Sequence, residues 1–125
     1  MATPLTVLLV DDTAAIRRSL RFFIEAETDL TICGEADNGR AAIEMVRELH
    51  PDVVLMDLSM PVMNGLEAAR EIGIIAPETH IFMLTLYAYP ELVREAKKLG
   101  VRRVISKLDG DPNNVVGAIR SVLAA

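Results

Sequence analysis

The 125-residue sequence has one cysteine, no tryptophan, few aromatic residues and no long apolar run. A single thiol, Cys33, cannot form an internal disulfide, which fits a reducing cytoplasmic setting. No segment approaches the roughly 20 apolar residues that cross a bilayer, and the N-terminus lacks the basic and apolar regions of a signal peptide. A net charge of −5 without a basic stripe argues against direct nucleic-acid binding. We therefore expect a cytoplasmic chain with no membrane contact.

The composition is that of a globular protein. Hydrophobic residues make up 51% of the chain and charged residues 25%. The length suffices for a full core without disulfides or a structural metal. We therefore expect a single domain over residues 1–125, in which Cys33 belongs to the core.

Short apolar runs rich in β-formers alternate with segments whose apolar residues recur at helical spacing. The predicted strands are Leu5–Val10, Leu30–Ala36, Asp52–Met56, His80–Leu84 and Val101–Ser106. The predicted helices are Ala14–Ala26, Gly39–Leu49, Gly65–Ile75, Glu91–Leu99 and Pro112–Leu123, with Asn38 and Asn64 as candidate caps. Nearly continuous apolar strands are expected where helices cover both faces of a parallel sheet. The alternation predicts an α/β fold of that kind, joined by right-handed crossovers.

Acidic residues stand at the ends of two predicted strands. Asp11 and Asp12 follow the first apolar run, and Asp57 ends the third. Converging carboxylates raise one another's pKa unless a divalent cation neutralises them, and Mg²⁺ prefers such oxygen ligands. The alternative is that Asp11 and Asp12 only cap the following helix, because aspartate suits a helix N-terminus.

Two other strands also end in polar residues, Thr85 after the fourth and Lys107 after the fifth. In open parallel sheets, ligands bind outside the carboxyl ends of the strands. An isolated lysine is usually a solvated amine, and an isolated threonine is usually a cap or turn residue. Together with the acids, however, the hydroxyl and the amine predict a phosphoryl site.

The segments Leu8–Asp12, Asp57–Gly65, Leu84–Thr85 and Ser106–Lys107, in this order and spacing, resemble the receiver domains of bacterial two-component response regulators. The resemblance covers essentially the whole chain. It implies a flavodoxin-like (βα)5 doubly wound sandwich with strand order 2-1-3-4-5. It also implies that the chain accepts a phosphoryl group from a phosphohistidine on a sensor histidine kinase or phosphotransfer protein, and later catalyses its hydrolysis.

Carried over by position, the resemblance makes Asp57 the nucleophile that forms an acyl phosphate. Asp12 and Asp57 would bind Mg²⁺ directly, Asp11 would bind it through water, and the carbonyl of Ser59 would complete the protein ligands. The serine also bears on an alternative, because a magnesium-dependent phosphatase with an aspartate nucleophile normally has a second acid at that position.

The same resemblance implies that Lys107 pairs with Asp57 at rest and with a phosphoryl oxygen afterwards, while Thr85 donates its hydroxyl to the phosphoryl group. The chain also departs from the family pattern: Val104 stands where an aromatic residue is usual, and Leu108 stands where proline is usual.

Three residues of the loop after the fourth strand also bear on the mechanism. Leu86 is larger than the residue that usually follows the threonine, and we expect it to crowd the phosphoryl group. Tyr87 and Tyr89 could substitute for the missing aromatic residue or simply pack on a neighbouring helix.

Receivers usually meet output domains, or dimerise, through the fourth helix, fifth strand and fifth helix. This side of the chain has five basic residues: Arg94, Lys97, Lys98, Arg102 and Arg103. The last helix is apolar over a wide arc: Val115, Val116, Ile119, Val122 and Leu123. A solvated surface is the alternative interpretation of the charges. The alternative function is a phosphorylation-independent protein-binding module, which would be expected to have lost an acid, the threonine or the lysine.

Overall fold

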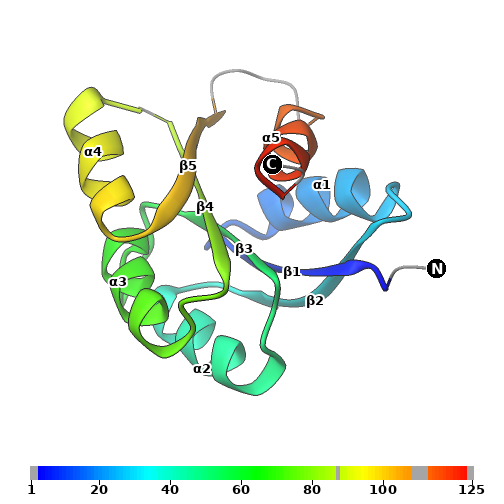
Figure 1. Ribbon diagram of the computed structural model, residues 1–125, viewed down its shortest axis with the longest axis horizontal. Coiled ribbons are helices and arrows are strands. Elements are labelled where there is room, and N and C mark those ends of the chain that lie inside the picture. Colours follow the sequence, from blue (N-terminus) through cyan, green and yellow to red (C-terminus); the bar gives the residue numbers. More distant parts are fainter. Residues whose placement is uncertain (1–2, 87, 108–112, 124–125) are drawn as a thin grey trace.

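The computed structural model describes residues 3–86, 88–107 and 113–123, with no side chain described at positions 113, 122 and 123. Its five parallel strands form one sheet in the order β2-β1-β3-β4-β5, which confirms the flavodoxin-like prediction (Figure 1). The strands are β1 (Leu5–Val10), β2 (Leu30–Ala36), β3 (Val53–Asp57), β4 (His80–Thr85) and β5 (Val101–Ser106). The helices are α1 (Ala14–Glu25), α2 (Gly39–Leu49), α3 (Gly65–Ile75), α4 (Pro90–Lys98) and α5 (Asn113–Leu123).

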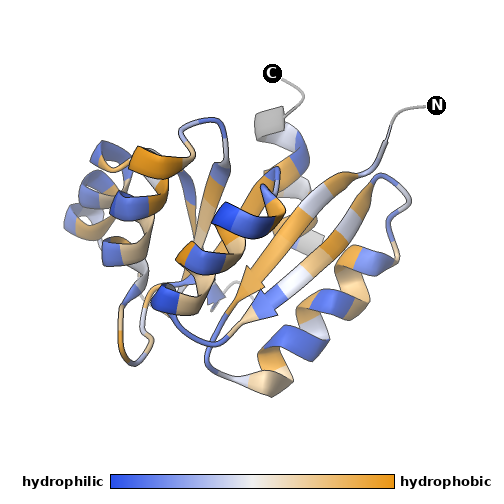
Figure 2. Ribbon diagram, turned by 90° about the horizontal axis from the view of Figure 1, so that it is seen from below, coloured by the Kyte–Doolittle hydropathy of each residue, from blue (hydrophilic) through white to orange (hydrophobic). Residues whose placement is uncertain are grey.

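The sheet separates two apolar cores, because successive side chains of a strand point to opposite faces. Along β1, Leu8 and Val10 join the core under α2, α3 and α4, whereas Val7 and Leu9 join the core under α1 and α5. Figure 2 shows the apolar strands between helices that turn apolar residues inward and polar residues outward. The predicted three-layer arrangement is therefore present.

The described element ends lie within one residue of those predicted. The third and fourth strands each run one residue further than expected, so that Asp57 and Thr85 are their last residues. Asn38 and Asn64 cap α2 and α3 as predicted, each accepting a hydrogen bond from a backbone N–H of the first turn. Cys33 is half-buried and packs against the core.

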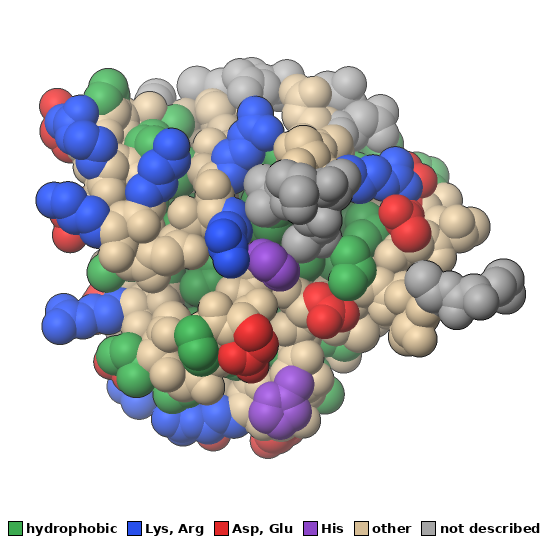
Figure 3. Space-filling model, in the orientation of Figure 1, with side chains coloured by type: hydrophobic (Ala, Val, Ile, Leu, Met, Phe, Trp, Pro, Cys, Tyr) green, Lys and Arg blue, Asp and Glu red, His purple; other side chains and the backbone are tan. Residues whose placement is uncertain are grey.

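The apolar arc of α5 is mostly core. Val115, Val116 and Ile119 are buried, which explains that part of the arc without a partner, and nothing is described of the side chains at 122 and 123. The five basic residues of α4 and β5 are exposed. In Figure 3, basic side chains gather on the side that α4 occupies in Figure 1. No described helix is long and apolar enough to cross a membrane.

Candidate functional site

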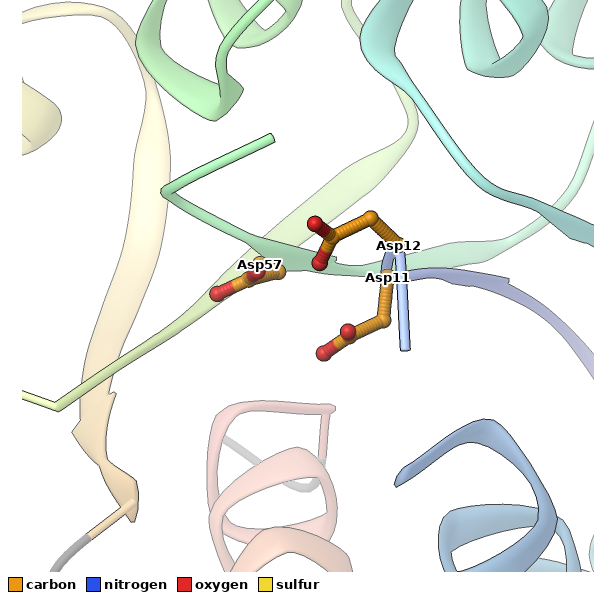
Figure 4. A group of neighbouring side chains, drawn as sticks. All are labelled: Asp11, Asp12 and Asp57. Atoms are coloured by element: carbon orange, nitrogen blue, oxygen red, sulfur yellow. The ribbon is translucent and has the colours of Figure 1, made fainter. Parts of the chain in front are cut away.

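The three predicted acids converge at the carboxyl edge of the sheet. One carboxylate oxygen from each of Asp11, Asp12 and Asp57 lies within 4.8 Å of the others, and Figure 4 shows the three groups from the ends of β1 and β3 facing a common space. Asp11 and Asp57 are buried, whereas Asp12 is exposed. Parallel strands bring these residues together because their carboxyl ends share one edge of the sheet.

Lys107, directly after β5, bridges two of the acids. Its Nζ lies 2.9 Å from Asp57 Oδ1 and 3.2 Å from Asp11 Oδ2. Burial disfavours the ammonium, but the contacts with Asp57 and Asp11 outweigh it and raise the pKa of Lys107. The lysine therefore stays charged and partly neutralises the acidic cluster.

Asp57 is an acid of this cluster whose ionised form is disfavoured by its surroundings. Burial raises the pKa of its carboxyl above the ordinary value. The hydrogen bond from Lys107 acts in the opposite direction, and the charges of Asp11 and Asp12 add to the rise. A further cation that reaches the site would therefore stabilise the ionised carboxylate of Asp57.

Helix capping does not account for the aspartate pair. The N-cap of α1 is Thr13, which makes no side-chain capping bond. Asp11 Oδ1 instead accepts a hydrogen bond of 2.9 Å from the Thr13 backbone N–H, before the helix starts. The nearest polar contact of Asp12 is a long one, 3.5 Å to the Thr13 hydroxyl. The carboxylate of Asp12 is therefore available to a ligand.

The donor set fits Mg²⁺, which takes oxygen ligands from one or two carboxylates and keeps several waters. Both oxygens of Asp11 already accept hydrogen bonds, from Thr13 and from Lys107. Asp12 and Asp57 thus have more accessible oxygens than Asp11 for direct contact with an ion. The direct and water-mediated roles implied by the family resemblance stay predictions.

A cavity of about 660 Å³ opens beside Asp57. Thr85 and Ser59 line it together with Lys107, so all the polar residues predicted after β3, β4 and β5 border one space. Its lining also has a largely apolar part: Ile16, Leu58, Leu86, Tyr89 and Leu92. Tyr87, a candidate substitute for the missing aromatic residue, and Leu108, which stands where proline is usual, lie outside the described residues.

The loop between Asp57 and α3 turns at Val62, where φ is 67°, and the Met63 N–H donates to the Pro61 carbonyl at 2.7 Å. Gly65 has no positive φ, and it is needed for close approach, since a Cβ there would lie 2.5 Å from the Asp57 carbonyl oxygen. A β-branched residue at positive φ is strained, and such strain concentrates at functional sites.

One contact was not predicted. Arg17, on α1, donates from Nη1 to the backbone carbonyl of Asp11 at 2.6 Å and from Nε to Glu35 at 2.9 Å. The sequence does not mark which backbone carbonyl accepts a hydrogen bond, because every residue has one. The available signal was a basic residue one turn into the helix that follows two acids.

Comparison with known proteins decides the family. The model of the response regulator receiver domain matches residues 7–120. The chain belongs to this family. Receiver domains of two-component response regulators generally bind Mg²⁺ and form a phosphoaspartate, in keeping with the acidic cluster described above.

This receiver domain is 40% identical over 116 residues to the chemotaxis protein CheY of Thermotoga maritima, covering 93% of the chain and 95% of the relative. It is 43% identical over 101 residues to the transcriptional regulatory protein YdfI of Bacillus subtilis, covering 81% of the chain and 47% of the relative. It thus spans about half the length of the transcriptional regulators that it matches. The solved response regulator domain of Thermotoga maritima CheB superposes with a TM-score of 0.91, at 29% identity and 98% coverage of both chains.

Proposed function

We propose that Asp57 is the phosphoacceptor of this receiver domain, with Mg²⁺ held by Asp12, Asp57 and the Ser59 carbonyl, and by Asp11 through water. The observation that carries the proposal is the buried Asp57 carboxylate, 2.9 Å from Lys107 Nζ and within 4.8 Å of two further acids. Such a site is poised to gain a cation and a phosphoryl group together. When bound, Mg²⁺ supplies positive charge to the phosphoryl oxygens.

In the transfer step, a carboxylate oxygen of Asp57 forms a bond to the phosphorus of a phosphohistidine. The P–N bond breaks, and the imidazole leaves after taking up a proton. Lys107 moves its hydrogen bond from Asp57 to a phosphoryl oxygen and offsets the charge of the loose transition state. In hydrolysis, water attacks the phosphorus and the bond between phosphorus and the Asp57 oxygen breaks. Inorganic phosphate leaves with the oxygen of the water, a proton passes to solvent, and Asp57 is regenerated as a carboxylate.

The proposed switch runs through Thr85, whose side chain lines the cavity beside Asp57. A hydrogen bond from its hydroxyl to the phosphoryl group would bias the loop between β4 and α4 towards a second packing. Val104 cannot supply an aromatic readout. Tyr89, which is 60% exposed at the N-cap of α4 and borders the same cavity, is the described aromatic residue placed to respond.

The proposed partners follow from the family. A cytoplasmic sensor histidine kinase or phosphotransfer protein supplies the phosphoryl group, and the exposed basic residues of α4 and β5 lie on the face offered to an output domain, an output protein or a second copy of the chain. Residues 1–125 constitute one receiver domain in this proposal. Output through an attached regulatory domain is supported by the similarity to YdfI, a transcriptional regulatory protein of which the match covers only 47%.

The alternative, a receiver-like module that binds partners without phosphorylation, is less well supported. Such a module has no need of a charged lysine between two buried acids, since burying those charges costs free energy. In this chain Lys107, Asp11 and Asp57 are all present and in contact.

The test is phosphorylation by acetyl phosphate and Mg²⁺, followed by intact-mass measurement. The wild-type protein is expected to gain one phosphoryl group and Asp57→Asn none, because the amide is not a nucleophile. Asp37→Asn is the control, since Asp37 is an exposed aspartate after β2, outside the acidic cluster. Equal labelling of wild type and Asp57→Asn would contradict the assignment.

A further inference from the structure

Arg17 ties three parts of the molecule together. Its Nη1 donates to the Asp11 carbonyl at 2.6 Å, and its Nε donates to Glu35 of β2 at 2.9 Å. The side chain is only 20% exposed. Arg21, one turn later on α1, binds the other oxygen of Glu35 at 2.7 Å but makes no hydrogen bond to Asp11 within the described part of the chain.

The Asp11 backbone is consequently held on both sides. Its N–H donates to the Ala36 carbonyl at 3.0 Å, and its carbonyl accepts from Arg17. A peptide unit is planar, so fixing this carbonyl fixes the plane through which the chain enters Asp12. The guanidinium therefore helps to place the Asp12 backbone, although no hydrogen bond joins it to the Asp12 carboxylate in the described part of the chain.

We propose that Arg17 is a positioning residue that orients the Asp11–Asp12 peptide for binding of the divalent cation, with Glu35 holding the guanidinium in place. The inference rests on the proposed Mg²⁺ site. Residues that orient metal ligands without touching the metal typically change its affinity by about 10–100-fold when they are removed. A planar guanidinium suits this role because it donates in two fixed directions at once.

The sign of the effect separates positioning from simple electrostatics. Arg17 is a cation bound to the backbone of one of the three acids, so deleting its charge would by itself strengthen, and not weaken, the binding of another cation. A positioning role predicts the opposite, because the Asp12 oxygen is no longer presented in a fixed direction. Weaker Mg²⁺ binding after loss of a positive charge therefore has no purely electrostatic explanation.

The experiment measures the Mg²⁺ dissociation constant by calorimetry for wild type, Arg17→Met and Arg21→Met. Arg21 is the matched control, since both arginines pair with Glu35 but only Arg17 binds the Asp11 carbonyl. We expect about tenfold weaker binding in Arg17→Met and near wild-type binding in Arg21→Met. Unchanged or tighter binding in Arg17→Met, or equal weakening in both variants, would overturn the inference.

A second measurement needs no metal. Thr13 donates its backbone N–H to Asp11 Oδ1, so hydrogen exchange of this amide reports on the same turn. Exchange is expected to be faster in Arg17→Met than in Arg21→Met, and equal rates would overturn the inference. If Arg17→Met does not fold, Arg17→Lys replaces it, because lysine keeps the charge but lacks the planar guanidinium with its two donor directions. About tenfold weaker Mg²⁺ binding is expected in that variant as well, and wild-type affinity would overturn the inference. Absence of Mg²⁺ binding by the wild-type protein would instead overturn the proposed function itself.

Discussion

Leu86 follows Thr85 and is 53% exposed, yet it borders the cavity that contains Asp57 and Lys107. A bulky side chain there obstructs the line along which water must approach the phosphorus. We therefore predict that Leu86→Ala shortens the lifetime of the acyl phosphate by roughly threefold, equivalent to about 0.6 kcal/mol in the barrier. The decay of phosphorylated protein, followed by phosphate release, measures this.

The control for this prediction is Leu49→Ala, which truncates a leucine of comparable exposure, 42%, at the end of α2. Its acyl phosphate should decay at the wild-type rate. A lifetime in folded Leu86→Ala that equals or exceeds that of wild type would assign Leu86 to packing or to a partner contact.

Among individual residues, the sequence predicted the proximity of side chains correctly where charged side chains stand at the ends of predicted strands. Asp11, Asp57 and Lys107 could be brought to one site because parallel strands end at the same edge. The contact of Arg17 with a backbone carbonyl could not be predicted, since any residue supplies such a carbonyl. The positive φ of Val62 was missed because valine is among the residues least expected there.

Helix α3 begins with a capping box that follows the loop from Asp57. Asn64 accepts from the Glu67 N–H at 3.0 Å, and Glu67 accepts from the Asn64 N–H at 3.4 Å. We predict that Asn64→Ala lowers the free energy of unfolding by about 1 kcal/mol, because an N–H of the first turn loses its partner. Urea denaturation measures the change.

Thr13→Ala provides the comparison at α1, whose N-cap makes no side-chain capping bond. Its cost should be well below that of Asn64→Ala. Equal losses in the two variants would mean that the capping bond at Asn64 contributes nothing beyond a general preference for a polar cap.

Element ends were predictable because apolar runs and capping residues both mark them. β1 and β2 were predicted to the residue, and β3 was displaced by one because Asp57 continues the ladder, paired with Leu84. The register shifts between Val7 and Leu8 and between Ile81 and Phe82 were not predicted. Such shifts depend on how two strands pair, and the apolar pattern within one strand does not indicate which residues of its neighbour it pairs with.

At the scale of the whole molecule, periodicity alone predicted alternating strands and helices but not their spatial order. The order 2-1-3-4-5 came from the resemblance to receiver domains and agrees with the sheet. Strand order decides function here, because it places β1 and β3 side by side and so brings Asp11 and Asp12 next to Asp57.

The global stability of the protein should report on metal binding through linkage. A ligand that binds only the folded state at tenfold excess over its Kd adds about 1.4 kcal/mol to the free energy of unfolding. We predict this gain for the wild-type protein in Mg²⁺ and its absence in Asp12→Ala, which loses a direct ligand. Chemical denaturation with Mg²⁺, and with chelator at matched ionic strength, measures both differences.

In chelator, without Mg²⁺, we expect a different order of stability for wild type and Asp12→Ala. Burial raises the pKa of Asp57, and the like charges of Asp11 and Asp12 raise it further, because neighbouring carboxylates repel one another. Asp12→Ala relieves part of this repulsion, so the variant should be at least as stable as wild type without Mg²⁺ and less stable with it. Asp37→Ala, outside the cluster, should keep the full Mg²⁺-dependent gain. A similar gain in Asp12→Ala would show that its carboxylate does not bind the ion, because the ligands that remain would then account for all of the linkage.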